Sequence, residues 1–417
     1  MVRAKPYDAR PTAAIATDGA AWLRDQAQHQ VRHNPHMLTL PPRNVSNGMD
    51  APTFDGIDVP EWKCQQPLEP EGASTMQITT IGIDLAKNVF QIHGADQRGK
   101  AVLRKQLRRE QVAPFFANLP PCLIGIEACS SAHHWARKLQ ALGHTVRLMA
   151  PQFVKPYVKS NKNDVADAEA ICEAVGRPTM RFVPIKNVEQ QSVLSLHRVR
   201  QAFVKARTAQ ANQIRGLLAE YGLIVPKGIG FIATRVPDLI EDASNELPGL
   251  FRQLIDRLLK HLKLLDQQVD EIEVQIKAWH RDDETSQKLQ KVPGIGPITA
   301  SALAATVGNA KNFDNGRQLA AWLGLVPRQN SSGGKQTLLG MSKRGDAYLR
   351  TLLIHGARSV LYRASQKNDT ESWLIKLTAR RNANVAAVAL ANKTARIVWA
   401  LLAHDREFRP DYTAAAA

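Results

Sequence analysis

Two short apolar runs, each ending in an acid, stand out in the pattern of hydrophobic and polar positions along the chain. Residues 78–83 read Ile-Thr-Thr-Ile-Gly-Ile and lead into Asp84, and residues 122–126 read Cys-Leu-Ile-Gly-Ile and lead into Glu127. Runs of β-branched residues favour strands buried in a sheet. A buried carboxylate without a partner is costly, so we expect Asp84 to meet a cation.

The surrounding pattern predicts an α/β domain. We expect strands at residues 78–87, 89–94, 101–107, 123–126 and 145–149, and helices at 111–118, 132–142 and 164–175. Three strands joined by short turns, followed by alternating helices and parallel strands, are typical of the ribonuclease-H-like fold. This fold places Asp84 on the first strand, near its centre.

A third acidic site opens the last of these helices. Asp164 and Asp167 are three residues apart and therefore lie on one helix face. Taken singly, each acid also suits a helix cap or a solvated strand end. The four acids in this order favour convergence on Mg²⁺, whose preferred ligands are oxygens and which, as a pair of ions, stabilises both oxygens of a phosphodiester exchange.

Beyond residue 182 the pattern turns helical, with long segments at 188–221 and 249–280. Apolar residues in the second segment recur at spacings of three and four: Leu254, Leu258, Leu262, Leu265, Val269, Ile272 and Ile276. The spacing predicts a helical hairpin or a coiled coil. Packing within the chain is the first interpretation, and dimerisation is an additional one.

Two glycine-containing stretches follow. Gly294 and Gly296 form a turn before a helix, which suits either backbone contact with a DNA phosphate or a simple interhelical connection. Further on, Ser331 and Ser332 precede two glycines in a polar segment that we expect to be a flexible loop. A serine hydroxyl flanked by cations can attack a phosphodiester, although such segments are also common as plain loops.

Charge points to a polyanionic partner. The 417 residues carry 55 Lys and Arg against 38 Asp and Glu, a net charge of +17, and 11 of these charges lie from Lys291 onward. Nucleic acid is the expected partner. There is no apolar run of eighteen residues and no signal peptide, so we expect a cytoplasmic, nucleoid-associated protein without membrane contact. Its four cysteines have no CxxC spacing and are expected to be reduced thiols.

Residues 1–75 are rich in proline and show no period, which predicts disorder. Met76 directly precedes the first strand, so we hypothesise that the extension is a gene-start artefact, which N-terminal sequencing of the native product tests. The expected segments are the extension (1–75), the α/β domain (76–183), the long helices (184–288), a C-terminal domain (289–405) and a tail (406–417).

Several blocks together resemble the DEDD transposases of bacterial insertion sequences, in particular the one-ten family and its eleven-eleven subgroup. The matching blocks, from about residue 76 to the end, are IGIDLAKNVFQIHG, IGIEACSSAHHWAR, KSNKNDVADAEAICEA, PGIGPITASALAATVG, PRQNSSGGK and MSKRGDAYLRTLLIHGAR. Two departures are Ser130, where many relatives have glycine, and the N-terminal extension.

The resemblance implies a RuvC-like domain with the tetrad Asp84, Glu127, Asp164 and Asp167, a coiled-coil dimerisation insert, and a mainly α-helical transposase domain. It further implies a phosphoserine at Ser332, with Ser331 as the competitor, in a composite Mg²⁺ site (one or two ions) shared between subunits of a homodimer or homotetramer. An element-encoded guide RNA would pair with donor and target DNA. Phosphates would be held by Lys87, Arg328, Lys335, Lys343, Arg344 and Arg350.

Two other functions remain open. A metal-dependent nuclease or Holliday-junction resolvase would use the four acids and water, and would therefore tolerate alanine at both Ser331 and Ser332. A non-catalytic nucleic-acid-binding scaffold would be indifferent to Asp84→Asn.

Overall fold

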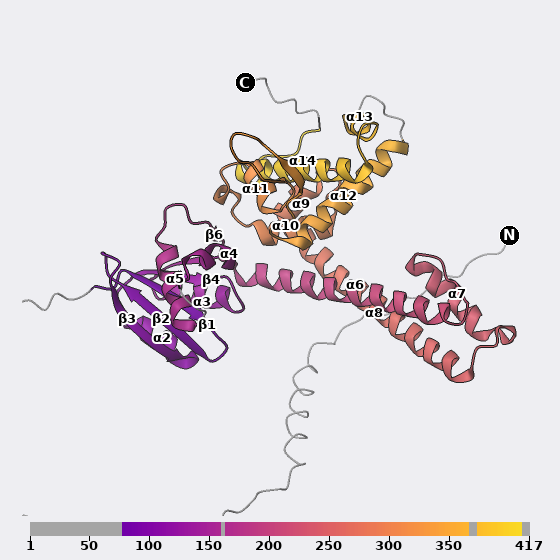
Figure 1. Ribbon diagram of the computed structural model, residues 1–417, viewed down its shortest axis with the longest axis horizontal. Helices are drawn as coiled ribbons and strands as arrows, with labels where there is room; N and C mark the ends of the chain where they lie inside the picture. The colour runs from indigo at the N-terminus through magenta and orange to yellow at the C-terminus, as the bar shows by residue number, and fades with distance from the viewer. Residues whose placement is uncertain (1–76, 160–162, 367–372, 411–417) are drawn as a thin grey trace, which may run out of the picture. The chain divides into compact units, whose positions relative to one another are not determined.

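The computed structural model describes residues 77–159, 163–366 and 373–410, as a mixed α/β region followed by a mainly helical part (Figure 1). The predicted disorder of residues 1–75 and most of the predicted tail lie outside the described residues. The α/β region contains, in order, β1 Thr80–Leu85, β2 Val89–Ala95, β3 Ala101–Arg108, α2 Arg109–Ala117, β4 Leu123–Glu127, α3 Ala132–Ala141, β5 Thr145–Met149, α4 Pro151–Val154, the 3-10 turn η1 Lys155–Tyr157, α5 Asp164–Val175 and β6 Phe182–Val183.

Each strand and helix expected in this region is present within a few residues of its predicted bounds. The pattern missed α4 and β6, which are too short to show a period. The strand order is β3-β2-β1-β4-β5-β6, with β1, β4 and β5 parallel and the other neighbours antiparallel. Asp84 is the penultimate residue of β1, so its expected place near the centre of the strand is wrong, although β1 itself lies inside the sheet.

Two apolar layers enclose the sheet. Fully buried side chains of β1 and β4 pack with Phe116 of α2 and with Trp135 and Leu139 of α3. The other layer, which includes Ile171 and Val175 of α5, packs with Met149 at the end of β5. The sheet is therefore covered by helices on both faces, which leaves its strand ends as the places where polar groups can reach solvent.

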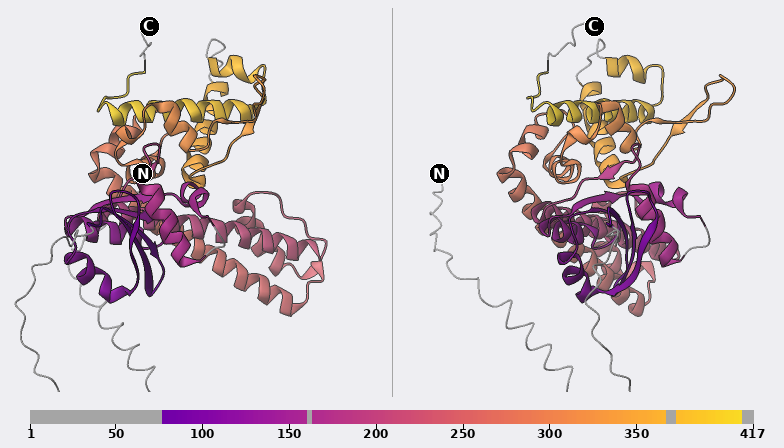
Figure 2. Two further views of the ribbon diagram at one scale, coloured as in Figure 1. Left: turned by 60° about the vertical axis from the view of Figure 1, so that its left-hand side comes forward. Right: turned by 90° about the vertical axis from the view of Figure 1, so that its left-hand side faces the viewer.

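Three helices follow: α6 Val188–Ala219, α7 Ile229–Glu241 and α8 Gly249–Asp282. Both Figures 1 and 2 show α6 and α8 side by side. They are antiparallel, because contacts descend along α8 as they ascend along α6: Arg200 pairs with Glu273 at 2.6 Å and Arg207 with Asp266 at 2.9 Å. The structure therefore has a helical hairpin within one chain, while pairing between subunits stays a prediction.

The buried stripe of α8 differs from the predicted one at its start. Leu262, Leu265, Val269 and Ile276 are buried as expected, but Leu254 is 42% exposed and Ile255 is buried in its place. Seven positions at mixed spacings of three and four do not fix where a stripe begins, because the neighbouring residue is also apolar. Leu254 therefore lies outside the hairpin core.

The C-terminal part is helical except for one hairpin. Its elements are α9 Glu284–Gln290, α10 Pro297–Val307, α11 Gly316–Trp322, β7 Pro327–Gln329, β8 Leu338–Met341, α12 Ala347–Gln366, α13 Trp373–Thr378 and α14 Ala383–Ala403. Within the described residues, only α14 is long and apolar enough to cross a membrane by length and composition. Its buried face, including Ala391 and Val398, packs in the core of this part, as in the core helix of a globular domain.

A buried polar chain joins the helical hairpin to the C-terminal helices. His197 of α6 lies 3.0 Å from the Tyr348 hydroxyl through Nδ1 and 3.1 Å from Ser301 Oγ through Nε2. Ser301 Oγ donates to the Pro297 carbonyl at 2.7 Å, so its only hydrogen is committed. His197 therefore carries its hydrogen on Nε2 and accepts the Tyr348 hydroxyl at Nδ1. Burial, followed by the charge of Arg200, lowers the pKa of His197 to about 4.

This neutral histidine predicts a loss of stability in acid. Its pKa is about 4 in the folded chain and near its ordinary value of 6.5 when unfolded, so the unfolded state binds more protons between these values. The free energy of unfolding should therefore decrease as pH falls from 6.5 to 4. Denaturant titrations across this range should give a shallower decrease for His197→Gln. The exposed His355→Gln on α12 should keep the wild-type slope, and equal slopes for all three proteins would contradict the assignment.

Candidate active site

Asp84 and Glu127 end two neighbouring parallel strands. The register places Ile83 of β1 beside Ile126 of β4, so the two acids occupy the next matched positions. Adjacent strands are about 4.8 Å apart, which brings the two carboxyl-bearing residues together at one edge of the sheet. Both residues are half-buried. The repeated Ile-Gly-Ile-acid pattern in the two strands is the sequence signal for this arrangement.

Glycines two residues before each acid allow α5 to cross the sheet at close range. A Cβ atom on Gly82 would lie 2.2 Å from the Ala168 carbonyl oxygen and 2.4 Å from the Cys172 nitrogen. A Cβ atom on Gly125 would lie 2.7 Å from Cβ of Val175. Because alternate residues of a strand share a face, Asp84 and Glu127 point to the same side of the sheet as α5.

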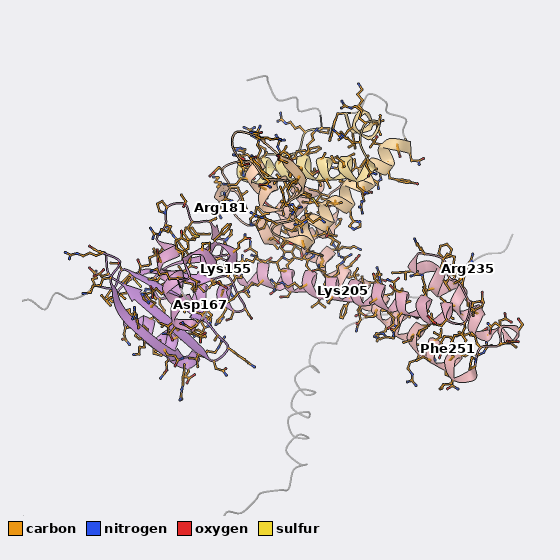
Figure 3. The ribbon with its side chains drawn as sticks, viewed as in Figure 1. Lys155, Asp167, Arg181, Lys205, Arg235 and Phe251 are labelled. Carbon is orange, nitrogen blue, oxygen red and sulfur yellow. The ribbon has the colours of Figure 1, made fainter. Side chains whose placement is uncertain are left out.

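The direction of α5 brings its acidic first turn to the same edge. Ala168 lies over Gly82, and the Cys172 thiol farther along α5 is 3.6 Å from the carbonyl of Thr80, so α5 runs opposite to β1. Asp164 is one turn before Ala168 on the same helix face. The start of α5, which includes Asp167 (Figure 3), therefore lies toward the end of β1 that carries Asp84.

The helix start itself favours acids. Asn163 caps α5 by accepting a hydrogen bond from the Ala166 amide at 2.8 Å. Carboxylates in the first turn are stabilised by the partial positive charge of the helix N-terminus. Asp164 is exposed and Asp167 is half-buried. The cap of α5 is thus Asn163 and neither aspartate, and both aspartates lie in the first turn of the helix.

The pKa of the Cys129 thiol is influenced by both strand-end carboxylates. Burial raises the pKa of its thiol, and the negative charges of Glu127 and Asp84 raise it further. The three cysteines of the described part are free thiols, and burial raises the pKa of Cys122 and of Cys172 to about 11. These thiols are therefore protonated near neutral pH.

The acids do not form a closed metal site in this structure. Across residues 77–159, 163–366 and 373–410, no three Asp, Glu, His or Cys side chains are close enough to hold one ion. The available donors at the strand edge are carboxylate oxygens, which suit a hard cation such as Mg²⁺. The convergence of all four acids on one ion therefore stays a prediction.

The serine segment is a hairpin, so the prediction of a flexible loop is wrong. β7 and β8 are antiparallel, and the Asn330 amide donates to the Thr337 carbonyl at 3.0 Å. The turn is closed by the Lys335 amide, which donates to the Ser332 carbonyl at 3.0 Å. Gly333 and Gly334 both have positive φ, of 54° and 77°, which is the two-glycine hairpin turn that matches strand twist.

The hairpin distinguishes the two serines. Ser332 and Lys335 form a bridge pair and therefore lie on one face of the hairpin, which puts an ammonium group beside the Ser332 hydroxyl. Ser331 points to the other face, where its Oγ accepts a hydrogen bond from Gln329 at 2.9 Å. Within the described chain, the Ser332 hydroxyl has no hydrogen-bond partner. Alternation along β7 also places Arg328 on the Ser332 face.

The base of the hairpin is held by two interlocked loops. A Cβ atom on Gly324 would lie 2.1 Å from the Arg344 carbonyl oxygen, and one on Gly345 would lie 1.8 Å from the Trp322 carbonyl oxygen. Arg350 Nη1 donates to the Arg344 carbonyl at 2.9 Å and to that of Leu323 at 3.0 Å. One nitrogen of this predicted phosphate ligand is therefore used within the fold.

The remaining predicted phosphate contacts are placed as follows. Lys343 and Arg344 are exposed at the hairpin base, and Lys87 is exposed between β1 and β2. The turn between α9 and α10 packs against α12, since a Cβ atom on Gly294 would lie 3.0 Å from the Gly356 carbonyl oxygen. Gly296 is exposed at the start of α10. Gly294 thus serves packing, and Gly296 has the more accessible amide.

The four acids and the serine hairpin fall in different family matches. A family model for DEDD transposases of IS110, described as "Transposase", matches residues 81–223, and one described as "Transposase IS116/IS110/IS902 family" matches residues 286–372. The chain is 55% identical over 337 residues to a "Probable family 20 transposase" of Pseudomonas aeruginosa, covering 80% of this chain and 100% of that protein. The chain belongs to the IS110/IS1111 family of insertion-sequence transposases.

Two further relatives in this family match over most of both chains. The transposase for insertion sequence element IS1328 of Yersinia enterocolitica is 46% identical over 332 residues, which are 79% of this chain and 98% of that protein. The transposase for IS1111A of Coxiella burnetii is 42% identical over 362 residues, which are 87% of this chain and 99% of that protein. The family implies action on DNA and dependence on a divalent metal.

The close approach of α5 to the sheet predicts opposite effects for two glycine substitutions. Gly82→Ala places a methyl group against the backbone of α5 and should lower the free energy of unfolding by about 3 kcal/mol or more, the upper range of overpacking. Gly216→Ala in α6 meets no atom within 4 Å and should raise it by about 0.5–1 kcal/mol. Denaturant unfolding of both variants checks this, and a neutral Gly82→Ala would contradict the crossing.

Proposed function

We propose that this transposase cleaves and exchanges DNA strands with the Ser332 hydroxyl as nucleophile, assisted by Asp84, Glu127, Asp164 and Asp167 in a ribonuclease-H-like, RuvC-like domain. The observation that supports the proposal is the crossing of α5 over Gly82, beside the parallel pairing of the strands that carry Asp84 and Glu127. The strand order, with three antiparallel strands beside parallel β4 and β5, supports the fold assignment. Ser331 is the competing nucleophile.

The proposed step is a phosphoryl transfer. Ser332 Oγ loses its proton to solvent as it forms a bond to phosphorus, the bond from phosphorus to a sugar oxygen breaks, and that oxygen takes one proton from solvent and leaves as a hydroxyl, so the number of protons is unchanged. The phosphoserine keeps the energy of the broken ester, so the reverse attack by another strand's hydroxyl completes exchange without ATP. Lys335 and Arg328, on the same hairpin face as Ser332, stabilise the charge on the phosphate oxygens.

One or two Mg²⁺ ions, held by the four acids, would supply charge stabilisation at the scissile phosphate and lower the pKa of the attacking hydroxyl. The acids and the serine hairpin fall in separate family matches, residues 81–223 and 286–372. We propose that the hairpin of one subunit completes the acidic edge of another within a homodimer or homotetramer. The exposed apolar residues Leu250 and Leu254 of α8 support association between subunits.

Sequence choice is proposed to come from an element-encoded guide RNA that pairs with donor and target DNA. The net charge of +17 suits a protein that holds nucleic-acid backbones, and backbone contacts carry little sequence information. Base pairing then selects the sites, as in other guided systems. We place the protein with the bacterial nucleoid.

Removal of one strand-end carboxylate should abolish the chemistry and leave the fold intact. Asp84→Asn keeps the size of the side chain but removes its charge, and we expect at least about a 100-fold loss of strand cleavage. Asp270→Asn on α8 makes the same change at an exposed position and should retain full activity. Cleavage of labelled donor DNA, with guide RNA and Mg²⁺ present, measures both. Unchanged cleavage by Asp84→Asn would contradict the role of the acidic edge, and a wild type that binds but does not cleave the DNA would favour a non-catalytic scaffold.

The serine proposal predicts a covalent protein–DNA adduct. Denaturing gels should show the adduct for the wild type and for Ser331→Ala but not for Ser332→Ala, and peptide mass spectrometry should locate the phosphate on Ser332. An adduct that survives Ser332→Ala and maps to Ser331 would reverse the assignment. Cleavage without an adduct, retained when both serines are alanine, would indicate a water-using nuclease or resolvase.

A further inference from the structure

A polar cavity of about 710 Å³ lies on the α5 side of the sheet. One wall is formed by β2, β3 and the turn between them, with His93, Arg98 and Arg104, and the other by the later turns of α5, with Glu169 and Glu173. None of the four acids lines it. The cavity is therefore separate from the candidate active site, although both lie on one face of the sheet.

Strand register connects the two places. Asp84 of β1 pairs with Gln91 of β2, and in the next row of the same face Gly82 pairs with His93, which pairs with Arg104 of β3. Arg104 therefore lies in the same row as Gly82, two strands away from it. This row is two residues before Asp84 along β1. With about 4.8 Å between strands and about 3.4 Å per residue, the two Cα positions are roughly 12 Å apart. This separation is a few nucleotides of an extended strand.

Charge in the cavity is not balanced. Lys159 pairs with Glu169 at 3.2 Å and with Glu173 at 3.1 Å, and Arg177 pairs with Glu173 at 2.6 Å. The acids of the α5 wall are thus neutralised by cations of the chain. Asp96 in the turn between β2 and β3 also lines the cavity, where its Oδ1 accepts hydrogen bonds from the backbone amides of Arg98 and Lys100, both at 2.9 Å. The lining therefore holds four cations (Arg98, Arg104, Lys159 and Arg177) against three acids (Asp96, Glu169 and Glu173). Arg98 and Arg104 have no ion pair within the described residues. The cavity therefore presents two arginines whose charges are available to an anion.

His93 adds an unsatisfied polar group to the wall. Its side chain is 5% exposed, and its Nδ1 is buried without a hydrogen-bond partner in the part of the chain that is described. A buried polar atom without a partner costs about 1–3 kcal/mol, so natural folds retain one mainly where something else binds. The polar residues Thr80 and Gln97, which also line the cavity, make the wall suited to a hydrated or anionic ligand rather than an apolar one.

We propose that this cavity binds a backbone phosphate of the nucleic-acid strand that passes Asp84, through the guanidinium groups of Arg98 and Arg104 beside His93. Arginine forks match phosphate geometry, and a contact at this distance from the acids would fix the register of the strand. The inference rests on the proposed function, because it assumes that a strand crosses the acidic edge. DNA and RNA have the same phosphate chemistry, and the test below distinguishes them.

The test measures binding without chemistry. The full-length protein is titrated, without Mg²⁺, with a labelled single-stranded oligonucleotide of mixed sequence, once as DNA and once as RNA, at several salt concentrations. Each phosphate contact contributes about 0.7 to the slope of log affinity against log salt for a single strand. Arg104→Gln and Arg98→Gln should each reduce the slope by about 0.7 for the strand that uses the cavity.

Lys105→Gln is the matched control, since Lys105 makes the same charge change from the opposite face of β3, where its ammonium lies 5.0 Å from the Phe115 ring. It should keep the wild-type slope. A decrease with DNA alone or RNA alone identifies the ligand strand. Slopes for Arg104→Gln equal to those for Lys105→Gln in both series would overturn the cavity proposal but leave adduct formation intact. A wild type that binds neither strand would contradict the proposed function as well.

Discussion

The close contact between the backbone of α5 and the glycines of two parallel strands is the constraint on which the candidate site depends. A helix that packs on ordinary strand side chains stands well clear of the sheet, and its first turn would then lie far from the strand ends. At Gly82 the space for a side chain is filled by the α5 backbone itself. In the proposed site, this contact would hold the acids of the strands and the helix at one edge of the sheet.

The position of the proposed serine nucleophile depends on a different set of contacts, those of the β7–β8 hairpin. The two-glycine turn and the interlocked loops at the hairpin base fix which face Ser332 occupies, and Lys335 shares this face by strand pairing. The buried chain from His197 through Tyr348 ties the start of α12, which follows the hairpin, to the long α6 helix. The proposed serine and the proposed acids thus lie in two parts of the chain that are stabilised by different contacts.

Most strands and helices of the α/β region can be predicted from the sequence, because the apolar runs and acids that mark them are local features. Apolar runs and their terminal acids located β1 and β4, and the acidic helix start located α5. The hairpin could not be predicted, because its strands are short, exposed and polar and so lack the period of two that marks a half-buried strand. The stripe of α8 was misplaced by one residue at Leu254, where two adjacent apolar residues compete for the core.

The alignment of one strand with another also cannot be predicted from the sequence pattern. Gly82, His93 and Arg104 come together in one row only when three strands are aligned. The spacing of residues within any one strand does not predict this row. The role of Gly82 and Gly125 was equally hidden, although their shared position two residues before an acid is visible in retrospect. Contacts that bring distant segments together are decided by packing, which local patterns do not encode.

Fe²⁺-directed backbone cleavage tests most directly whether the four acids share one cation site. Fe²⁺ replaces Mg²⁺ in the transposase, and hydroxyl radicals generated with ascorbate and peroxide cut the chain next to the bound ion. The account predicts cuts in three segments, around Asp84, Glu127 and Asp164, which disappear with excess Mg²⁺ or in Glu127→Gln. Cuts restricted to one of these segments, or located only elsewhere in the chain, would contradict the shared site.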